Sequence, residues 1–372
     1  MAATTDIVTV NAQVTPAPEP SLLQQSGALV SVGGTTLTTG TYLYCSDLAA
    51  VTAVLSALGN YAELTKMATT YFAQGSAVGV YILELGVQAA VADGISALQT
   101  WITTTPNQFY AYLCPASWDG VGATLNTMAA NYSSPTGRTY FFVTTTAATM
   151  AAYVSTTKAI FALVPSPTAA STEFQCAAPF YAFLANDPNV GSPAAPMAYR
   201  YLYGVTPWVE NGNATSIGTI LTAFVNIIGT GAEGGISTAI LFKGTTMDGN
   251  QLMAWYAIDW VQIQAKQQLA AAIINGSNSN PPLYYSQAGI NALLAVLTGI
   301  GSDAVSSGLL ASQVPSTSLP NGSPAFTAVS FATYTTQNPT AYAAGSYGGF
   351  SATVTAQNGF LTITFNLDAV SF

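Results

Sequence analysis

Five carboxylates in the first third of the chain are the side chains whose chemistry could serve catalysis. A carboxylate pair acts as general acid and base when the fold holds both groups beside one substrate. These five fall in separate predicted elements and show no spacing of that kind. Helix capping and surface solubility are the better interpretation of them. The five residues are Asp47, Glu63, Glu84, Asp93 and Asp119.

The chain contains no histidine, which excludes a Ser-His-Asp site, a Cys-His site and a histidine-ligated zinc ion. Its three cysteines, Cys45, Cys114 and Cys176, are odd in number, far apart and without metal-binding spacing. We therefore expect buried free thiols in a reduced compartment. We predict no catalytic residue, no metal site and no cofactor, and we do not expect an enzyme.

Two further patterns could indicate ligand binding. Residues 229–234 match G-x-G-x-x-G, which in a dinucleotide fold follows a strand and opens a helix. Here the match follows a helix predicted at 217–228 and precedes a strand predicted at 236–243, so the order is wrong for nucleotide binding. The 20 tyrosines and 5 tryptophans could line a sugar-binding groove, but most lie in apolar runs typical of cores and subunit contacts.

Charge is scarce and unevenly distributed. Six Lys and Arg stand against fifteen Asp and Glu, and the net charge is −9. The cations do not cluster, so we predict no nucleic-acid partner. No charged residue occurs between Asp303 and Asp368, which indicates a surface covered by copies of the same chain. The cations are Lys66, Arg138, Lys158, Arg200, Lys243 and Lys266.

The apolar stretches are interrupted by Gly, Ser, Thr or Asn and are shorter than the roughly 18 to 20 residues that cross a bilayer. We therefore predict no membrane span. The start of the chain lacks a basic region followed by an apolar segment, so a cleaved secretion signal is not expected.

Short apolar strands alternate with helices from residue 22 to about residue 164, which predicts an α/β fold with a largely parallel sheet. Helices are also expected at 174–185, 217–228, 258–275 and 287–298, and a strand at 236–243. In the first part, strands are predicted at 41–45, 78–85, 109–114, 140–143 and 160–164, and helices at 47–58, 62–73, 87–103, 121–131 and 147–155.

Both ends of the chain are predicted to be strands. Residues 6–14 alternate apolar and polar side chains, and the prolines at 16, 18 and 20 form a stiff tether behind them, so residues 1–20 read as an arm. Near the other end, Asn358–Gly359 separates two alternating runs, 351–356 and 361–367, which predicts a two-residue hairpin. The apolar faces comprise Val8, Val10, Ala12, Val14, Leu361, Ile363, Phe365 and Leu367.

These patterns divide the chain into an arm (1–20), an α/β domain (21–245, with a possible subdivision near 165–235) and a C-terminal α+β domain (246–372) that ends in a hairpin arm. The predicted fold class is α/β: a mixed, largely parallel sheet core with a C-terminal α+β domain and extended terminal strands.

Two segments resemble the tail sheath proteins of contractile phages. Residues 71–75, Tyr-Phe-Ala-Gln-Gly, end a predicted helix before the strand Val-Gly-Val-Tyr-Ile-Leu at 78–83. Gln-Gly-Ser replaces the usual Asn-Gly-Gly turn of the family, and Glu84 stands near a common Arg. The second segment comprises the helix at 259–274, the connector Pro-Leu-Tyr-Tyr at 282–285 and Gly289–Ile290, and it is similar to the C-terminal domain of sheaths.

The resemblance implies a structural subunit. In sheaths, terminal arms add strands to small sheets of neighbouring subunits and link hexameric rings into a helical tube around the tail tube. It implies further partners, namely a tail tube protein and baseplate and tail terminator proteins, and a virion tail assembled in the host cytoplasm. The strand contacts between subunits would involve the apolar faces at 8–14 and 361–367, unless both strands close onto their own chain.

Two alternatives stay open from the sequence. Low charge and alternating terminal strands also suit another lattice-forming virion protein, such as a tail tube, capsid or surface-layer subunit. Exposed Tyr and Trp side chains suit a carbohydrate-binding adhesin. Tube formation favours the sheath, whereas a monomer with saturable glycan binding favours the adhesin.

Overall fold

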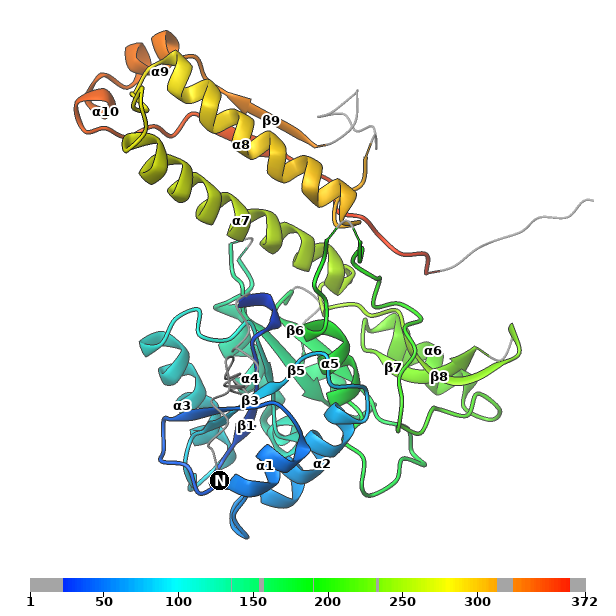
Figure 1. Ribbon diagram of the computed structural model, residues 1–372. Coiled ribbons are helices and arrows are strands. Elements are labelled where there is room, and N and C mark those ends of the chain that lie inside the picture. Colours follow the sequence, from blue (N-terminus) through cyan, green and yellow to red (C-terminus); the bar gives the residue numbers. More distant parts are fainter. Residues whose placement is uncertain are drawn as a thin grey trace, which may run out of the picture.

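The computed structural model describes residues 23–134, 136–153, 157–189, 191–231, 234–312 and 324–361. Figure 1 shows a layered body of sheet and helices below, and a pair of long helices with a small sheet above. Helix α7 (Leu252–Ser277) begins against the body and runs into the upper part, so it links the two.

A six-stranded sheet with the order β2-β3-β1-β4-β5-β6 forms the centre of the body. Its neighbouring strands are parallel, except for the antiparallel pair β2–β3 at one edge. The predicted α/β class with a largely parallel sheet is confirmed. The strands are β1 (Gly27–Ser31), β2 (Tyr42–Cys45), β3 (Val80–Glu84), β4 (Ala111–Leu113), β5 (Tyr140–Thr144) and β6 (Ile160–Leu163).

Helices cover both faces of this sheet, which is why its strands read as apolar runs. Leu29 of β1 enters the core on one face, while its neighbours Ala28 and Val30 enter the core on the other. The first core includes residues of α1 (Leu48–Val54), α2 (Tyr61–Phe72), α5 (Ala177–Leu184) and α7. The second includes residues of α3 (Val91–Thr104), the 3-10 helix η2 (Ala116–Val121), α4 (Gly122–Ala130) and α6 (Ala214–Thr222).

Two local predictions for the body need correction, and one strand was not predicted. The helix expected at 147–155 is wrong: the described part holds only the short 3-10 helix η3 (Met150–Ala152). The helix expected at 217–228 ends at Thr222, because Phe224 has a positive φ of 61° and the β-branched residues after it form strand β7 (Ile227–Gly231). Strand β1 was not predicted individually.

Strand β7 pairs antiparallel with β8 (Ile236–Phe242). The G-x-G-x-x-G match at 229–234 therefore begins inside a strand of this pair. The described residues that follow the match enter β8, which pairs back onto β7.

The upper part consists of α7, α8 (Gln287–Ser306) and a two-stranded antiparallel sheet of β9 (Ala325–Ala328) and β10 (Phe350–Thr353). Helix α8 extends eight residues beyond the predicted 287–298, since Gly299 and Gly301 do not break it. Gly301 permits a close approach: a Cβ there would lie 2.3 Å from the ring of Phe326 in β9. The short helices α9 (Phe331–Gln337) and α10 (Pro339–Ala343) connect β9 to β10.

The hairpin predicted at Asn358–Gly359 is wrong for the described residues. Neither residue has the positive φ that its two-residue turn requires. The first run instead pairs through β10 with β9, with Ser351 opposite Thr327. Residues 362–367 of the second run lie outside the described residues.

Glu84, at the end of β3, is a buried carboxylate that closes the loop after β1. Its two oxygens accept hydrogen bonds from the hydroxyls of Ser31 (2.6 Å) and Thr35 (2.7 Å). They also accept from the backbone N–H groups of Gly33 (2.7 Å), Thr35 (3.2 Å) and Gly86 (2.6 Å). The side chain is 1% exposed. Glu84 therefore has a structural role, satisfying donors that water does not reach.

We expect Glu84→Gln to lower the free energy of unfolding by about 2–4 kcal/mol, because an amide NH₂ would face donors that now meet an acceptor. Urea unfolding followed by circular dichroism measures this. Glu210→Gln, at an exposed position, serves as the control for loss of a carboxylate and should leave the stability unchanged. Equal stability of both variants would contradict this role of Glu84.

Candidate assembly interface

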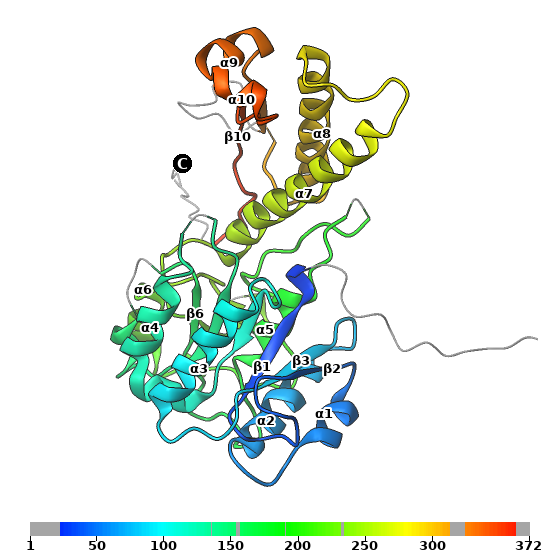
Figure 2. The ribbon, with the colours of Figure 1, turned by 90° about the vertical axis from the view of Figure 1, so that its left-hand side faces the viewer.

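Residues 349–361 form one extended segment that descends from the small upper sheet toward the start of α7 (Figure 2). At its upper end the carbonyl of Gly349 accepts from Val329 N (3.0 Å) beside the β9–β10 ladder. Farther down, the carbonyl of Thr355 accepts from Ala311 N (2.9 Å), and Gln357 N donates to the carbonyl of Leu309 (2.8 Å). The segment is therefore held by successive partners along its length.

The lower end of this segment is held by two side chains of the body. Gln251, the residue before α7, donates from Nε2 to the Gly359 carbonyl (2.8 Å) and accepts at Oε1 from Gly359 N (2.9 Å). Tyr199 donates its hydroxyl to the carbonyl of Leu361. A Cβ on Gly359 would lie 2.7 Å from Cβ of Pro196, so glycine is needed here for close approach. We call Gln251 and Tyr199 the exit clamp.

All these bonds use odd-numbered residues of the segment. In an extended chain, N–H and C=O groups of successive residues point to opposite edges. The odd-numbered residues therefore direct their groups to one edge, which β9, residues 309–311 and the exit clamp fill. The even-numbered residues, from Phe350 to Phe360, direct theirs to the other edge, where no backbone bond is recorded within the described chain. Within the part of the chain that the structure describes, this second edge has no backbone partner, and we call it the open edge.

The open edge carries none of the devices that usually protect a strand edge. Natural edges are blunted by charged side chains, proline or bulges, because unpaired backbone groups recruit other strands. Residues 349–361 contain no charge and no proline, and Phe360 is 79% exposed. The edge is therefore suited to pairing with an added strand.

Most of the residues predicted to make inter-subunit strand contacts lie outside the described chain. Leu361 is within it, at the exit clamp. The others are Val8, Val10, Ala12, Val14, Ile363, Phe365 and Leu367. The sequence reasoning missed Gln251 and Tyr199, and no local pattern marks them, because their partners are more than a hundred residues away along the chain.

The remaining candidate carboxylates are held separately rather than gathered at one site. Asp47 caps α1 by accepting from Ala50 N (2.8 Å), and Asp93 accepts from Ala90 N (3.0 Å) at the start of α3. Glu63 accepts from Ala116 N (2.9 Å). The Asp119 carboxylate accepts from the hydroxyls of Thr149 and Tyr153. Capping is thus confirmed for Asp47 and Asp93.

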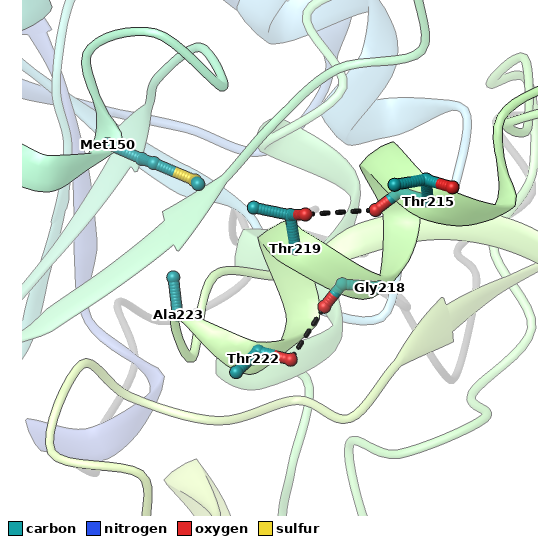
Figure 3. Close-up of a pocket in the computed structure, with 6 residues that line it drawn as sticks. All are labelled: Met150, Thr215, Gly218, Thr219, Thr222 and Ala223. Carbon is teal, nitrogen blue, oxygen red and sulfur yellow. Dashed lines mark hydrogen bonds between the residues drawn. The ribbon is translucent and has the colours of Figure 1, made fainter.

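Neither the three cysteines nor a surface recess beside α6 presents an activated nucleophile. Cys45, Cys114 and Cys176 are buried free thiols, as predicted, and burial raises the pKa of the Cys45 thiol to about 12. Among the described residues, no group of three potential metal ligands is found. Figure 3 shows a recess of about 510 Å³ beside α6, lined by Met150, Thr215, Gly218, Thr219, Thr222 and Ala223, none of which is ionisable. The hydroxyls of Thr219 and Thr222 donate to carbonyls within α6.

One helix of the described chain, α8, is long and apolar enough to cross a membrane when judged by length and composition alone. In this structure it packs against α7 and β9. Core helices of soluble proteins meet the same criterion, so our prediction of no membrane span stays a prediction.

The start of α7 is fixed to the sheet by a buried carboxylate. Asp259 is fully buried, and its Oδ2 accepts from the hydroxyls of Tyr110 and Tyr140 (2.8 Å each), which stand at the amino ends of β4 and β5. Its Oδ1 has no hydrogen-bond partner in the described residues. Burial raises the pKa of this carboxyl to about 6, despite the opposing effects of Lys158 and the two tyrosines.

Known structures share this fold over nearly the whole chain. A chain of the anti-feeding prophage baseplate, 6-fold symmetrised, superposes with a TM-score of 0.65 at 12% identity, covering 100% of both chains. The anti-feeding prophage helical sheath in contracted state gives 0.61 at 12% identity, covering 98% of this chain and 99% of that one. The sheath tail protein of Listeria innocua gives 0.50 at 9% identity, covering 84% and 90%.

No model of a protein family matches the sequence, and no curated protein does. The similarity therefore concerns the fold. The chain has the fold that is found in sheath subunits of contractile tail-like assemblies.

Proposed function

We propose that this chain is the structural subunit of a contractile tail sheath. Copies would assemble as stacked hexameric rings around a tail tube, and their repacking would drive the tube into the host. The partners are then further copies of the chain, a tail tube protein, and baseplate and tail terminator proteins, in a virion or phage-like tail assembled in the host cytoplasm. The chain has no enzymatic role in this proposal.

The open, uncharged edge of residues 349–361 carries the proposal. A strand edge of this length with no charge and no proline is an aggregation hazard for a free monomer. The hazard disappears if another chain supplies a strand. An added strand forms a row of backbone hydrogen bonds with the open edge. Its alternate apolar side chains pack against the face of the small sheet.

We assign the added strands to the two ends of the chain. Residues 6–14 lie behind a proline-rich tether, and residues 361–367 continue the segment held by the exit clamp. Strands on tethers keep neighbouring subunits connected while the subunits move relative to one another. The division into an arm (1–20), an α/β domain (21–245) and a C-terminal domain (246–372) belongs to this proposal.

Deletion of residues 1–20 should yield a folded subunit that no longer forms tubes, because it removes the proposed arm strand and leaves every residue of the described helices and strands in place. Circular dichroism and negative-stain electron microscopy measure fold and assembly separately. As a control, the tether prolines 16, 18 and 20 can be replaced by alanine, which retains the strand. Normal tubes from the deletion variant would count against the arm.

A further inference from the structure

The sequence around Asn358–Gly359 favours a structure that the chain does not adopt. Asn-Gly between two alternating runs is a strong hairpin signal, because both residues accept positive φ at low cost. In the structure neither Asn358 nor Gly359 has a positive φ, so the turn is not formed. Something outside the dipeptide must therefore oppose its local preference, and the contacts of Gly359 and its neighbours identify what does so.

The hairpin would use the edge of the odd-numbered residues, which already bond to other parts of the chain. In a two-residue hairpin around 358 and 359, residues 357 and 360 bond to each other, so residues 357, 355 and 353 face the returning strand. These are odd-numbered residues. Gln357 and Thr355 are instead bonded to Leu309 and Ala311, at 2.8 and 2.9 Å. The returning strand and these partners compete for one edge.

The exit clamp acts directly at the turn. The Gln251 side-chain amide binds both backbone polar groups of Gly359, as a neighbouring strand would. A type I′ turn would rotate both groups away from Gln251. Gln251 thus stabilises the extended conformation of the dipeptide, and the Tyr199 hydroxyl does the same two residues later at Leu361.

We propose that the exit clamp prevents the C-terminal strand from folding back on its own chain and directs it to a neighbouring copy. Gln251 is the main positioning residue, with Tyr199 assisting. Without the clamp, residues 361–367 would compete with β9 and with residues 309–311 for the inner edge of residues 351–357, and any strand that paired there would be lost to assembly. This inference rests on the proposed sheath function for its consequence, although the clamp itself can be tested on isolated subunits.

The first test is hydrogen exchange on isolated full-length subunits. Gln251→Ala should raise the exchange rate of the Gly359 amide about tenfold, because it loses its acceptor. Gln74→Ala is a matched control: the Gln74 amide also binds both backbone groups of one residue, Tyr203, but far from the C-terminal segment. An unchanged Gly359 rate in Gln251→Ala would overturn the clamp. This test does not depend on tube formation, so it can succeed even if the sheath function fails.

The second test separates self-pairing from simple loosening. Gln251→Ala should reduce the yield of assembled tubes at least tenfold, whereas Gln74→Ala should not. Adding Asn358→Val should restore assembly, because a β-branched residue disfavours positive φ while suiting the extended conformation. Asn358 is exposed, so the change disturbs no core. Wild-type yield from Gln251→Ala, or failure of Asn358→Val to rescue, would overturn the self-pairing inference.

Discussion

Ala352→Pro should abolish tube formation while leaving the subunit folded. The N–H of Ala352 points to the open edge of the 349–361 segment, so the substitution removes no hydrogen bond within the chain. Proline is tolerated in edge strands for this reason. An added strand, however, would lose the hydrogen-bond donor at 352 and meet the pyrrolidine ring within the pairing.

The control for this variant is Ala352→Thr, which keeps the N–H and favours extended backbone. Thermal unfolding should be similar for both variants and the wild type, and assembly followed by light scattering should fail only for proline. Tubes formed by Ala352→Pro at the wild-type concentration would show that this edge takes no strand.

The second large effect concerns the pH dependence of stability at the start of α7. The pKa of the Asp259 carboxyl rises from its ordinary 3.8 to about 6 on folding, because burial disfavours the charged form. The folded state therefore binds a proton more tightly than the unfolded state. The contribution of Asp259 to the free energy of unfolding is therefore fully present below about pH 4 and is lost as the pH rises to about 6.

This difference corresponds to about 3 kcal/mol. Asp259→Asn removes the titration while keeping an oxygen for Tyr110 and Tyr140. The stability of Asp259→Asn relative to the wild type should therefore improve by about 3 kcal/mol between pH 4 and pH 7.5. Because only the difference between the two proteins is compared, the titration of other groups cancels.

Urea unfolding at several pH values measures this difference. A constant difference between the two proteins across the range would contradict the raised pKa of Asp259. Tyr140→Phe, which deletes one donor to the carboxylate, should shift the range over which stability is lost toward higher pH.

The central sheet could be predicted because its strands carry their signal locally. A parallel sheet covered on both faces needs continuous apolar strands, and runs such as Val80–Glu84 and Tyr140–Thr144 show that pattern. Strand β1 escaped individual prediction although Ala28 to Val30 are buried, because its short run begins with glycine.

The candidate interface could be predicted only in part. Alternation marked β10 as a strand, but its partner β9 lies beyond two short helices and has no turn signal linking it to β10. Asn358–Gly359 gave a strong local signal for a hairpin turn. Contacts of Gly359 with Gln251 and Pro196, which are distant in the sequence, override that signal. The stretch without charge between Asp303 and Asp368 includes the whole open edge, so the sequence prediction and the candidate interface concern the same region.

The most direct test of the proposed function is negative-stain electron microscopy of the purified full-length protein across a concentration series. We predict wide hollow tubes with a helical repeat, built of stacked rings. A narrow tube or a flat sheet would contradict the sheath assignment in favour of another lattice, and particles that stay monomeric at every concentration would contradict self-assembly.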